Sequence, residues 1–193
     1  MVEAARPTPL AHARAFCAPD TTAAQAGAGV CVAERRAVGL ATILLRRGQA
    51  AALTRNLGWG PPSGPRVAHG QGLALIGLGP ASWLAVAADP TADFAARLAA
   101  RLTPAASVSD QSSAYGLLWL TGPAAGCLLA KGVFLDLDRF AAGDAVTTQI
   151  AHMNVLLWRE ENGWTLACAR SCASSLWHWI LTNAAEFGLA HTD

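Results

Sequence analysis

The predicted elements of this 193-residue chain occur in the same order twice, which limits the fold more than any single motif does. In each half a buried strand precedes a short helix, an apolar hairpin follows, and a longer helix closes the unit. Glycines ten residues apart bracket the short helix, Gly48 and Gly58 in the first half and Gly122 and Gly132 in the second. This order predicts an α+β fold of two βαββα units with a pseudo-two-fold relation.

The first half predicts, in order, a strand at 39–45, a helix at 48–57, hairpin strands at 73–78 and 83–87, and a helix at about 91–102. Gly58 ends the short helix as a C-cap residue, and the proline-rich segment 60–65 cannot continue it. Asp89 supplies a capping side chain, and Pro90 suits the first turn of the longer helix. Phe94, Leu98 and Leu102 form the apolar stripe of that helix.

The second half predicts a strand at 115–120, a helix from Thr121-Gly122-Pro123 to Gly132, hairpin strands at 149–160 and 164–169, and a helix from about 171 to 187. Residues 153–158 are apolar on both sides, so both faces of this sheet are covered, either by helices of the chain or on one face by a partner. Trp177 falls in the apolar stripe of the last helix, whereas Trp179 falls outside it. We interpret Trp179 either as local packing or as an aromatic anchor in a subunit interface.

The two ends of the chain differ in composition. Residues 1–28 are rich in Ala, Pro and Thr and predict an extended or flexible N-terminal arm. Residues 30–32 predict a short strand. We expect 29–193 to form a single α+β domain of two similar halves, at about 29–104 and 105–193.

One stretch is long enough to cross a membrane. Residues 67–88 contain no Asp, Glu, Lys or Arg. However, Gly77, Gly79 and Pro80 interrupt its middle, which favours a buried β-hairpin over a membrane-spanning helix.

The charge content predicts partners. Charged residues make up only 14% of the chain and hydrophobic residues 53%, whereas an average domain is about a quarter charged. We therefore expect partner chains to cover part of the apolar surface. The net charge of +1 argues against nucleic acid or an anionic membrane as a partner. The five cysteines show no C-x-x-C spacing and no signal peptide is evident, so we expect reduced thiols in the cytoplasm.

The residues that could carry chemistry are isolated from one another, so the sequence predicts no catalytic, cofactor-binding or metal site. His152 and His178 have no Cys, Asp or Glu at ligand spacing. Cys168 and Cys172 are interpreted as small buried residues, and Ser171 as a helix cap. The polar segment 110–113 predicts a turn, with contact to a ligand at a partner's edge as the alternative.

Four residues are candidates for contact with a partner: Trp179, Trp158, Phe134 and Arg170. The three aromatic residues belong to the type that is enriched at subunit interfaces. For Arg170 we also hypothesise an ion pair with Asp136 or Asp138, which would join two helix-end segments.

Several motifs of the chain occur together in one family. They are Gly79 to Leu84, Asp110 to Ser112, Thr121-Gly122-Pro123, Leu129 to Leu137 with Phe140 and Gly143, Arg170 to Leu181, and Ala184 to Gly188. In this combination the chain resembles the gamma subunit of heterotetrameric sarcosine oxidase. The link from Leu137 to Phe140 is shorter than is usual in the family, and the first sixty residues match little.

The resemblance implies part of the folate-binding aminomethyltransferase fold and a non-catalytic structural role. It implies contact mainly with the alpha subunit, and further beta and delta subunits. The assembled flavoenzyme would oxidise sarcosine to glycine, giving formaldehyde or methylenetetrahydrofolate and hydrogen peroxide. FAD, FMN, NAD and tetrahydrofolate would lie in the alpha and beta subunits and zinc in delta, with no cofactor in this chain. The alternatives are a gamma-type subunit of an N-methylglutamate dehydrogenase-like complex, or a freestanding folate-binding or assembly protein.

Overall fold

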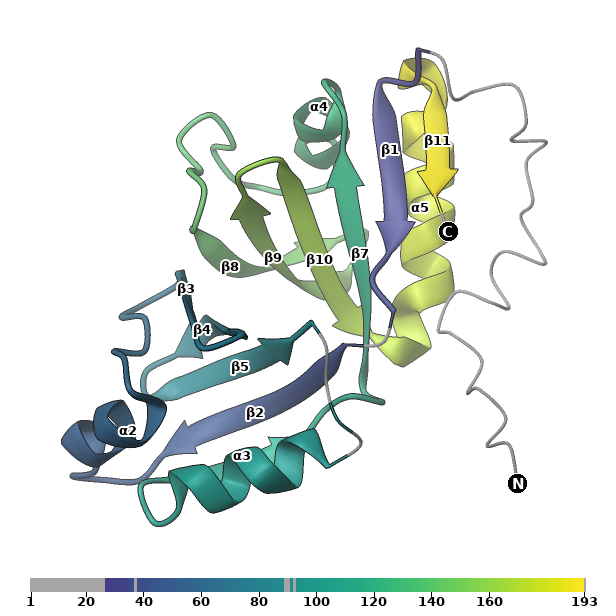
Figure 1. The fold of residues 1–193 in the computed structure, drawn as a ribbon. Helices are drawn as coiled ribbons and strands as arrows, with labels where there is room; N and C mark the ends of the chain where they lie inside the picture. Colours follow the sequence, from purple (N-terminus) through teal and green to yellow (C-terminus); the bar gives the residue numbers. More distant parts are fainter. Residues whose placement is uncertain (1–26, 37, 89–90, 92, 193) are drawn as a thin grey trace, which may run out of the picture.

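Two β-sheets stacked on each other form the centre of the molecule (Figure 1). The computed structural model describes residues 27–36, 38–88, 91 and 93–192. The predicted arm at 1–28 and the predicted Asp89-Pro90 cap therefore lie wholly or almost wholly outside the described residues. The domain limits stay a prediction.

The smaller sheet is antiparallel throughout and has the order β3-β4-β5-β2-β6. Its strands are β2 (Gly39–Leu45), β3 (Val67–Gly70), β4 (Leu73–Gly79), β5 (Ser82–Ala87) and β6 (Ala106–Asp110). The helices α2 (Ala50–Leu57) and α3 (Phe94–Leu102) pack on its outer face. The apolar stretch at 67–88 thus forms the predicted hairpin, as β4 and β5, and in addition the strand β3, which was not predicted.

The larger sheet has six strands in the order β11-β1-β7-β10-β9-β8. They are β1 (Val30–Glu34), β7 (Tyr115–Thr121), β8 (Ala145–Ile150), β9 (Met153–Glu160), β10 (Gly163–Ala169) and β11 (Leu189–Thr192). The helices α4 (Ala125–Ala130) and α5 (Ala173–Ala184) pack on its outer face, and short 3₁₀ turns flank α5 at Arg170–Cys172 and Ala185–Phe187. Only β1 and β11 pair in parallel in the described sheets.

The predicted α+β class and the repeated element order are confirmed. In both sheets the strand before the short helix lies beside the last strand of the following hairpin, so β2 and β5 correspond to β7 and β10. Each unit is longer than predicted, because β3 and β8 precede the hairpin and β6 and β11 follow the second helix. The larger sheet differs from the smaller one by β1, which lies between β7 and β11.

The strands that the sequence analysis missed lie at sheet edges. β6 is largely polar and exposed, so its residues show no apolar strand pattern and were interpreted as the segment before the strand at 115–120. The predicted strand at 149–160 is broken at Ala151 and His152, whose φ angles of 47° and 69° form a tight turn between β8 and β9. The predicted helix start at residue 91 is also wrong, because α3 begins at Phe94 with Asp93 as its N-cap residue.

A third apolar core joins the two sheets. It contains Leu40, Ile76, Leu84 and Val86 of the smaller sheet and Leu117, Ala145, Leu156, Trp158 and Ala167 of the larger one. Alternate residues of β9 point to opposite faces, so Val155 and Leu157 pack under the helices while Leu156 and Trp158 face the other sheet. The second face of β9 is therefore covered by the same chain.

Leu84 and Leu44 lie on the same face of the smaller sheet but differ in burial. Replacing each with alanine removes the same side chain from a strand, so a difference between the two variants reports on burial. Leu84 is 1% exposed and Leu44 50% exposed. Leu84→Ala should lower the free energy of unfolding by about 2–5 kcal/mol, because it leaves a cavity between the sheets. Leu44→Ala should change it by only about 0.5 kcal/mol. Urea unfolding of the isolated chain measures both, and equal losses would contradict the assigned inter-sheet core.

Candidate functional site

The helix-end segments of the second half meet where α4 and α5 end. Lys131, directly after α4, forms an ion pair with Glu186 and donates a hydrogen bond of 2.9 Å to the carbonyl oxygen of Asn183. Its Nζ also lies 4.8 Å from the ring centroid of Phe187. The only lysine of the chain thus ties the end of α4 to the end of α5, two parts that lie more than fifty residues apart.

Trp179 packs against the turn that follows α4. A Cβ atom added to Gly132 would lie 2.5 Å from Cζ2 of Trp179 and 3.1 Å from Cγ2 of Ile150. The indole ring therefore lies directly on the backbone of Gly132. The local-packing interpretation of Trp179 is confirmed, and its role as an anchor for a partner stays a prediction.

Gly132→Ala should weaken this junction. The new methyl group must displace the Trp179 ring, and overpacking of this kind costs about 1–3 kcal/mol. Gly126→Ala is the matched control, because Gly126 lies in α4 with open space around its Cα and alanine favours helix by about 1 kcal/mol. Thermal unfolding should show a lower Tm for the first variant and an equal or higher Tm for the second. An unchanged Tm for Gly132→Ala would contradict the close contact.

Phe134 extends fully into solvent, with an exposed fraction of 101%, although Val133 beside it is buried. The loop that carries it is anchored at its far end, where the backbone N–H of Ala141 donates to Oδ2 of Asp144 at 2.8 Å. Phe140 stacks on Trp164 with ring centroids 5.6 Å apart. Phe134 is therefore an exposed aromatic side chain on an anchored loop, as a contact residue requires.

The two remaining candidates for partner contact lie elsewhere. Trp158 is 3% exposed within the inter-sheet core, so the structure contradicts its assignment to the surface. Arg170 lies at the end of β10, where its backbone N–H donates to the carbonyl oxygen of Ala114 at 2.8 Å. Its contact with a partner stays a prediction.

The hypothesised ion pair of Arg170 is wrong. Asp136 and Asp138 line a hollow together with Gly122 and Trp164, whereas Arg170 follows the far end of β10. The reason is topological: Ala169 pairs with Tyr115 at the start of β7, whereas α4 and the loop that carries the aspartates follow the opposite end of β7. The sheet thus separates the two helix-end segments.

A polar cluster lies at the edge of the inter-sheet core around Glu160. Its Oε2 accepts a hydrogen bond of 2.6 Å from Arg35, and its Oε1 accepts bonds from Thr165 at 2.7 Å and from the indole N–H of Trp158 at 3.1 Å. The Arg35 guanidinium lies 5.3 Å from the ring centroid of Trp119. Burial opposes ionisation of Glu160, but the hydrogen bonds, first from Arg35 and then from Thr165, outweigh it and lower its pKa below 4.5.

The contribution of Glu160 to stability should depend on pH. Because its pKa is lower in the folded chain, the stabilisation is fully present above about pH 4.5 and is lost as the pH falls through the folded value. Glu160→Gln should lower the free energy of unfolding by about 1–3 kcal/mol at pH 7. The difference from the wild type should shrink below pH 4.5, as chemical denaturation over a pH series would show. A difference independent of pH would contradict the charged cluster.

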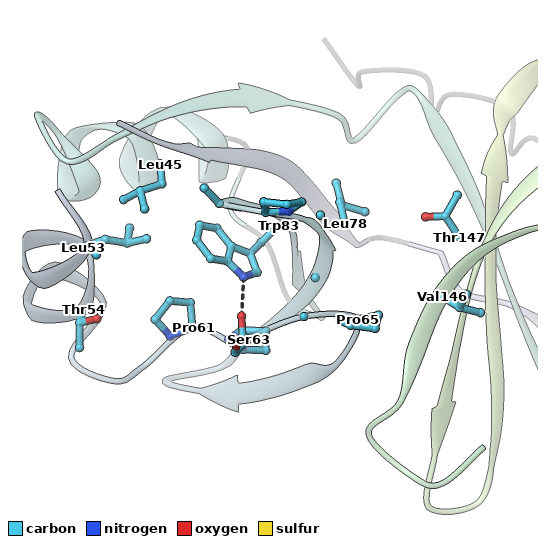
Figure 2. Close-up of a pocket in the computed structure, with 17 residues that line it drawn as sticks. Leu45, Leu53, Thr54, Pro61, Ser63, Pro65, Leu78, Trp83, Val146 and Thr147 are labelled. Carbon is cyan, nitrogen blue, oxygen red and sulfur yellow. Dashed lines mark hydrogen bonds between the residues drawn. The ribbon is translucent and has the colours of Figure 1, made fainter. Parts of the chain in front are cut away.

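A groove lies between α2, the proline-rich loop 61–65 and the turn from β4 to β5 (Figure 2). Its volume is about 690 Å³. The lining contains Leu53, Thr54, Pro61, Ser63, Leu78, Pro80, Trp83 and Thr147 among seventeen residues, none of them charged. Such a lining offers no general acid, general base or metal ligand. The sequence analysis missed this groove, because loop, turn and β8 residues meet only in the folded chain.

The isolated cysteine and serine residues follow the sequence predictions only in part. Cys168 is buried as predicted, but Cys172 is only partly buried. The prediction that Ser171 caps the last helix is wrong, because Ser171 lies inside the 3₁₀ turn and the N-cap residue of α5 is Cys172, without a side-chain capping hydrogen bond. Burial, and then the nearby Cys172, raises the pKa of the Cys168 thiol to about 12, so it is not a nucleophile at neutral pH. Segment 110–113 forms a turn in which the N–H of Ser112 donates to Oδ1 of Asp110 at 2.8 Å. Among the described residues, no group of three or more His, Cys, Asp or Glu side chains could hold a metal ion. None of the described helices is long and apolar enough to cross a membrane.

Comparison with known proteins gives clear relatives, although no protein-family model matches the chain. The sarcosine oxidase subunit gamma of Corynebacterium sp. (strain P-1) is 36% identical over 143 residues, which cover 71% of this chain and 70% of that protein. The chain belongs to the sarcosine oxidase gamma-subunit family. The subunit gamma of Arthrobacter sp. is 32% identical over 142 residues, with 71% and 70% covered.

Solved structures agree with this family. A chain of the heterotetrameric sarcosine oxidase from Corynebacterium sp. U-96, in complex with pyrrole 2-carboxylate, matches with a TM-score of 0.81 and 30% identity. The match covers 97% of this chain and 99% of that chain. Aminomethyltransferase T of the glycine cleavage system from Bartonella henselae matches with a TM-score of 0.67 and 17% identity, over 86% of this chain and 48% of that one. This second likeness confirms the expected aminomethyltransferase-like fold.

Proposed function

We propose that this chain is a non-catalytic structural subunit of a sarcosine oxidase-type oxidoreductase complex. The observation that carries the proposal is the match over nearly the full length of both chains to a subunit of a heterotetrameric sarcosine oxidase. The sarcosine oxidase gamma subunits at 32–36% identity support it. The alternatives, a subunit of an N-methylglutamate dehydrogenase-like complex or a freestanding folate-binding protein, are not favoured, because these relatives are all sarcosine oxidase subunits.

In this proposal the reaction takes place in the partner chains. The complex oxidises the N-methyl group of sarcosine to give glycine, formaldehyde or methylenetetrahydrofolate, and hydrogen peroxide. FAD, FMN, NAD and tetrahydrofolate belong to the alpha and beta subunits, and zinc to the delta subunit. The groove of this chain agrees with that division, because no charged side chain in it could pair with a phosphate or carboxylate group. The compartment that we propose is the cytoplasm, as the cysteine pattern suggested.

We further propose that the loop with Phe134, next to the junction of Lys131, Gly132 and Trp179, contacts the alpha subunit. A fully exposed aromatic ring gains most from burial in a partner's pocket, and Phe, Tyr and Trp are enriched in such contacts. Arg170 is a further proposed contact at the other end of the sheet.

Native mass spectrometry of the tagged chain, purified from its own cells, tests the assembly. The chain should be recovered with larger flavin-bearing subunits, and recovery as a free monomer would overturn the proposal. Phe134→Asp should weaken assembly at least about tenfold, because a buried carboxylate without a partner costs more than 1.4 kcal/mol. Phe134→Leu, which keeps an apolar side chain, is the matched control and should assemble nearly as well as the wild type. Equal assembly of both variants would exclude Phe134 as a contact.

A further inference from the structure

The groove beside Trp83 has rigid walls. The Trp83 indole N–H donates to the carbonyl oxygen of Pro62 at 2.9 Å, as the dashed line in Figure 2 shows. Prolines at 61, 62, 65 and 80 restrict the backbone of both walls. The loop lies so close to β4 that a Cβ atom on Gly77 would be 2.0 Å from the carbonyl oxygen of Gly64.

Residues at the start of β8 in the larger sheet hold the same loop from its other side. The Arg66 guanidinium pairs with Asp144 at 2.6 Å. Backbone hydrogen bonds join the N–H of Val67 to the oxygen of Gly143 at 2.8 Å, and the N–H of Ala145 to the oxygen of Pro65 at 2.9 Å. Contacts on both sides thus hold the groove open before anything binds. A preformed groove loses little conformational freedom on binding, which favours affinity.

The lining determines which chemistry fits. All seventeen lining residues are uncharged, so a charged group buried here would lose its hydration and gain no ion pair. The hydroxyl groups of Thr54, Ser63 and Thr147 can donate to or accept from peptide groups (Figure 2). An uncharged extended peptide therefore fits both the apolar walls and the hydroxyl groups.

We propose that this groove is a docking site for an uncharged, apolar segment of a partner subunit, separate from the surface around Phe134. The inference rests on the proposed function, because a member of the heterotetramer has other subunits available to cover the groove. The chain also carries too few charges to cover an ordinary monomer, and no charged residue lines the groove. The partner segment buries its apolar side chains against Leu78 and the prolines and directs its peptide groups to the hydroxyls.

Substitution at Thr54 provides the first test, since this residue lies on α2 with an exposed side chain. Thr54→Arg places a charge in the groove and should weaken assembly with the other subunits at least tenfold. Thr54→Val is the matched control and should assemble like the wild type. The isolated Thr54→Arg chain should unfold like the wild type, which separates loss of docking from loss of fold. Wild-type affinity in Thr54→Arg would overturn the docking site.

A second test identifies the occupant in the intact complex. A photo-crosslinking benzoylphenylalanine at position 63 should form a covalent link to another subunit, found by peptide mass spectrometry. A link to residues 1–26 of this chain, to a second copy, or to no protein would overturn the proposal. If the wild-type chain itself does not assemble, the proposed function fails. If it assembles and Thr54→Arg assembles equally well, only the docking site fails.

Discussion

The apolar contact between the two sheets is the constraint on which the rest of the structure depends. Each unit could cover one face of its sheet with its own helices, and the other face had to be covered by the other unit. Leu84 and Val86 of one sheet and Leu156 and Trp158 of the other provide this cover. The contact also places β8 beside β4 and so creates the uncharged groove at the edge where the sheets meet.

The polar contacts of the chain lie around these cores rather than inside them. Glu160 closes one edge of the inter-sheet core with Arg35, Thr165 and Trp158 as hydrogen-bond partners. Lys131 joins the ends of α4 and α5 on the outer face. A chain with only 14% charged residues uses several of them to fix its own structure, which leaves fewer to hydrate its surface. This agrees with membership in a family whose solved relative is a heterotetramer.

Local patterns predicted the elements whose residues carry strong periodicity or strong turn signals. β2 was predicted over its full range, and Gly58 ends α2 with a φ of 79°. Edge strands such as β3 and β6 were missed, because β3 has only four residues and β6 is largely polar, and only their neighbours in the sheet make them strands. The groove could not be predicted, since its walls come from segments that the sequence shows only as loop, turn and strand.

The sequence by itself determined the α+β class, the repeated order of elements and the family. Hydrophobic periodicity, the placement of glycines and the short family motifs are all local properties of the chain. Only the tertiary structure decided which faces are covered from within. The alternation of side chains along β9 places Trp158 on the face away from the helices, which either a partner or the opposite sheet could have covered. The packing of the two halves buries it under the opposite sheet. Arg170 and Asp136 belong to neighbouring motifs in the family pattern, yet β7 and β10 carry them to opposite ends of one sheet. The distance between two residues that lie far apart in the sequence depends on the strand order, which no local sequence pattern encodes.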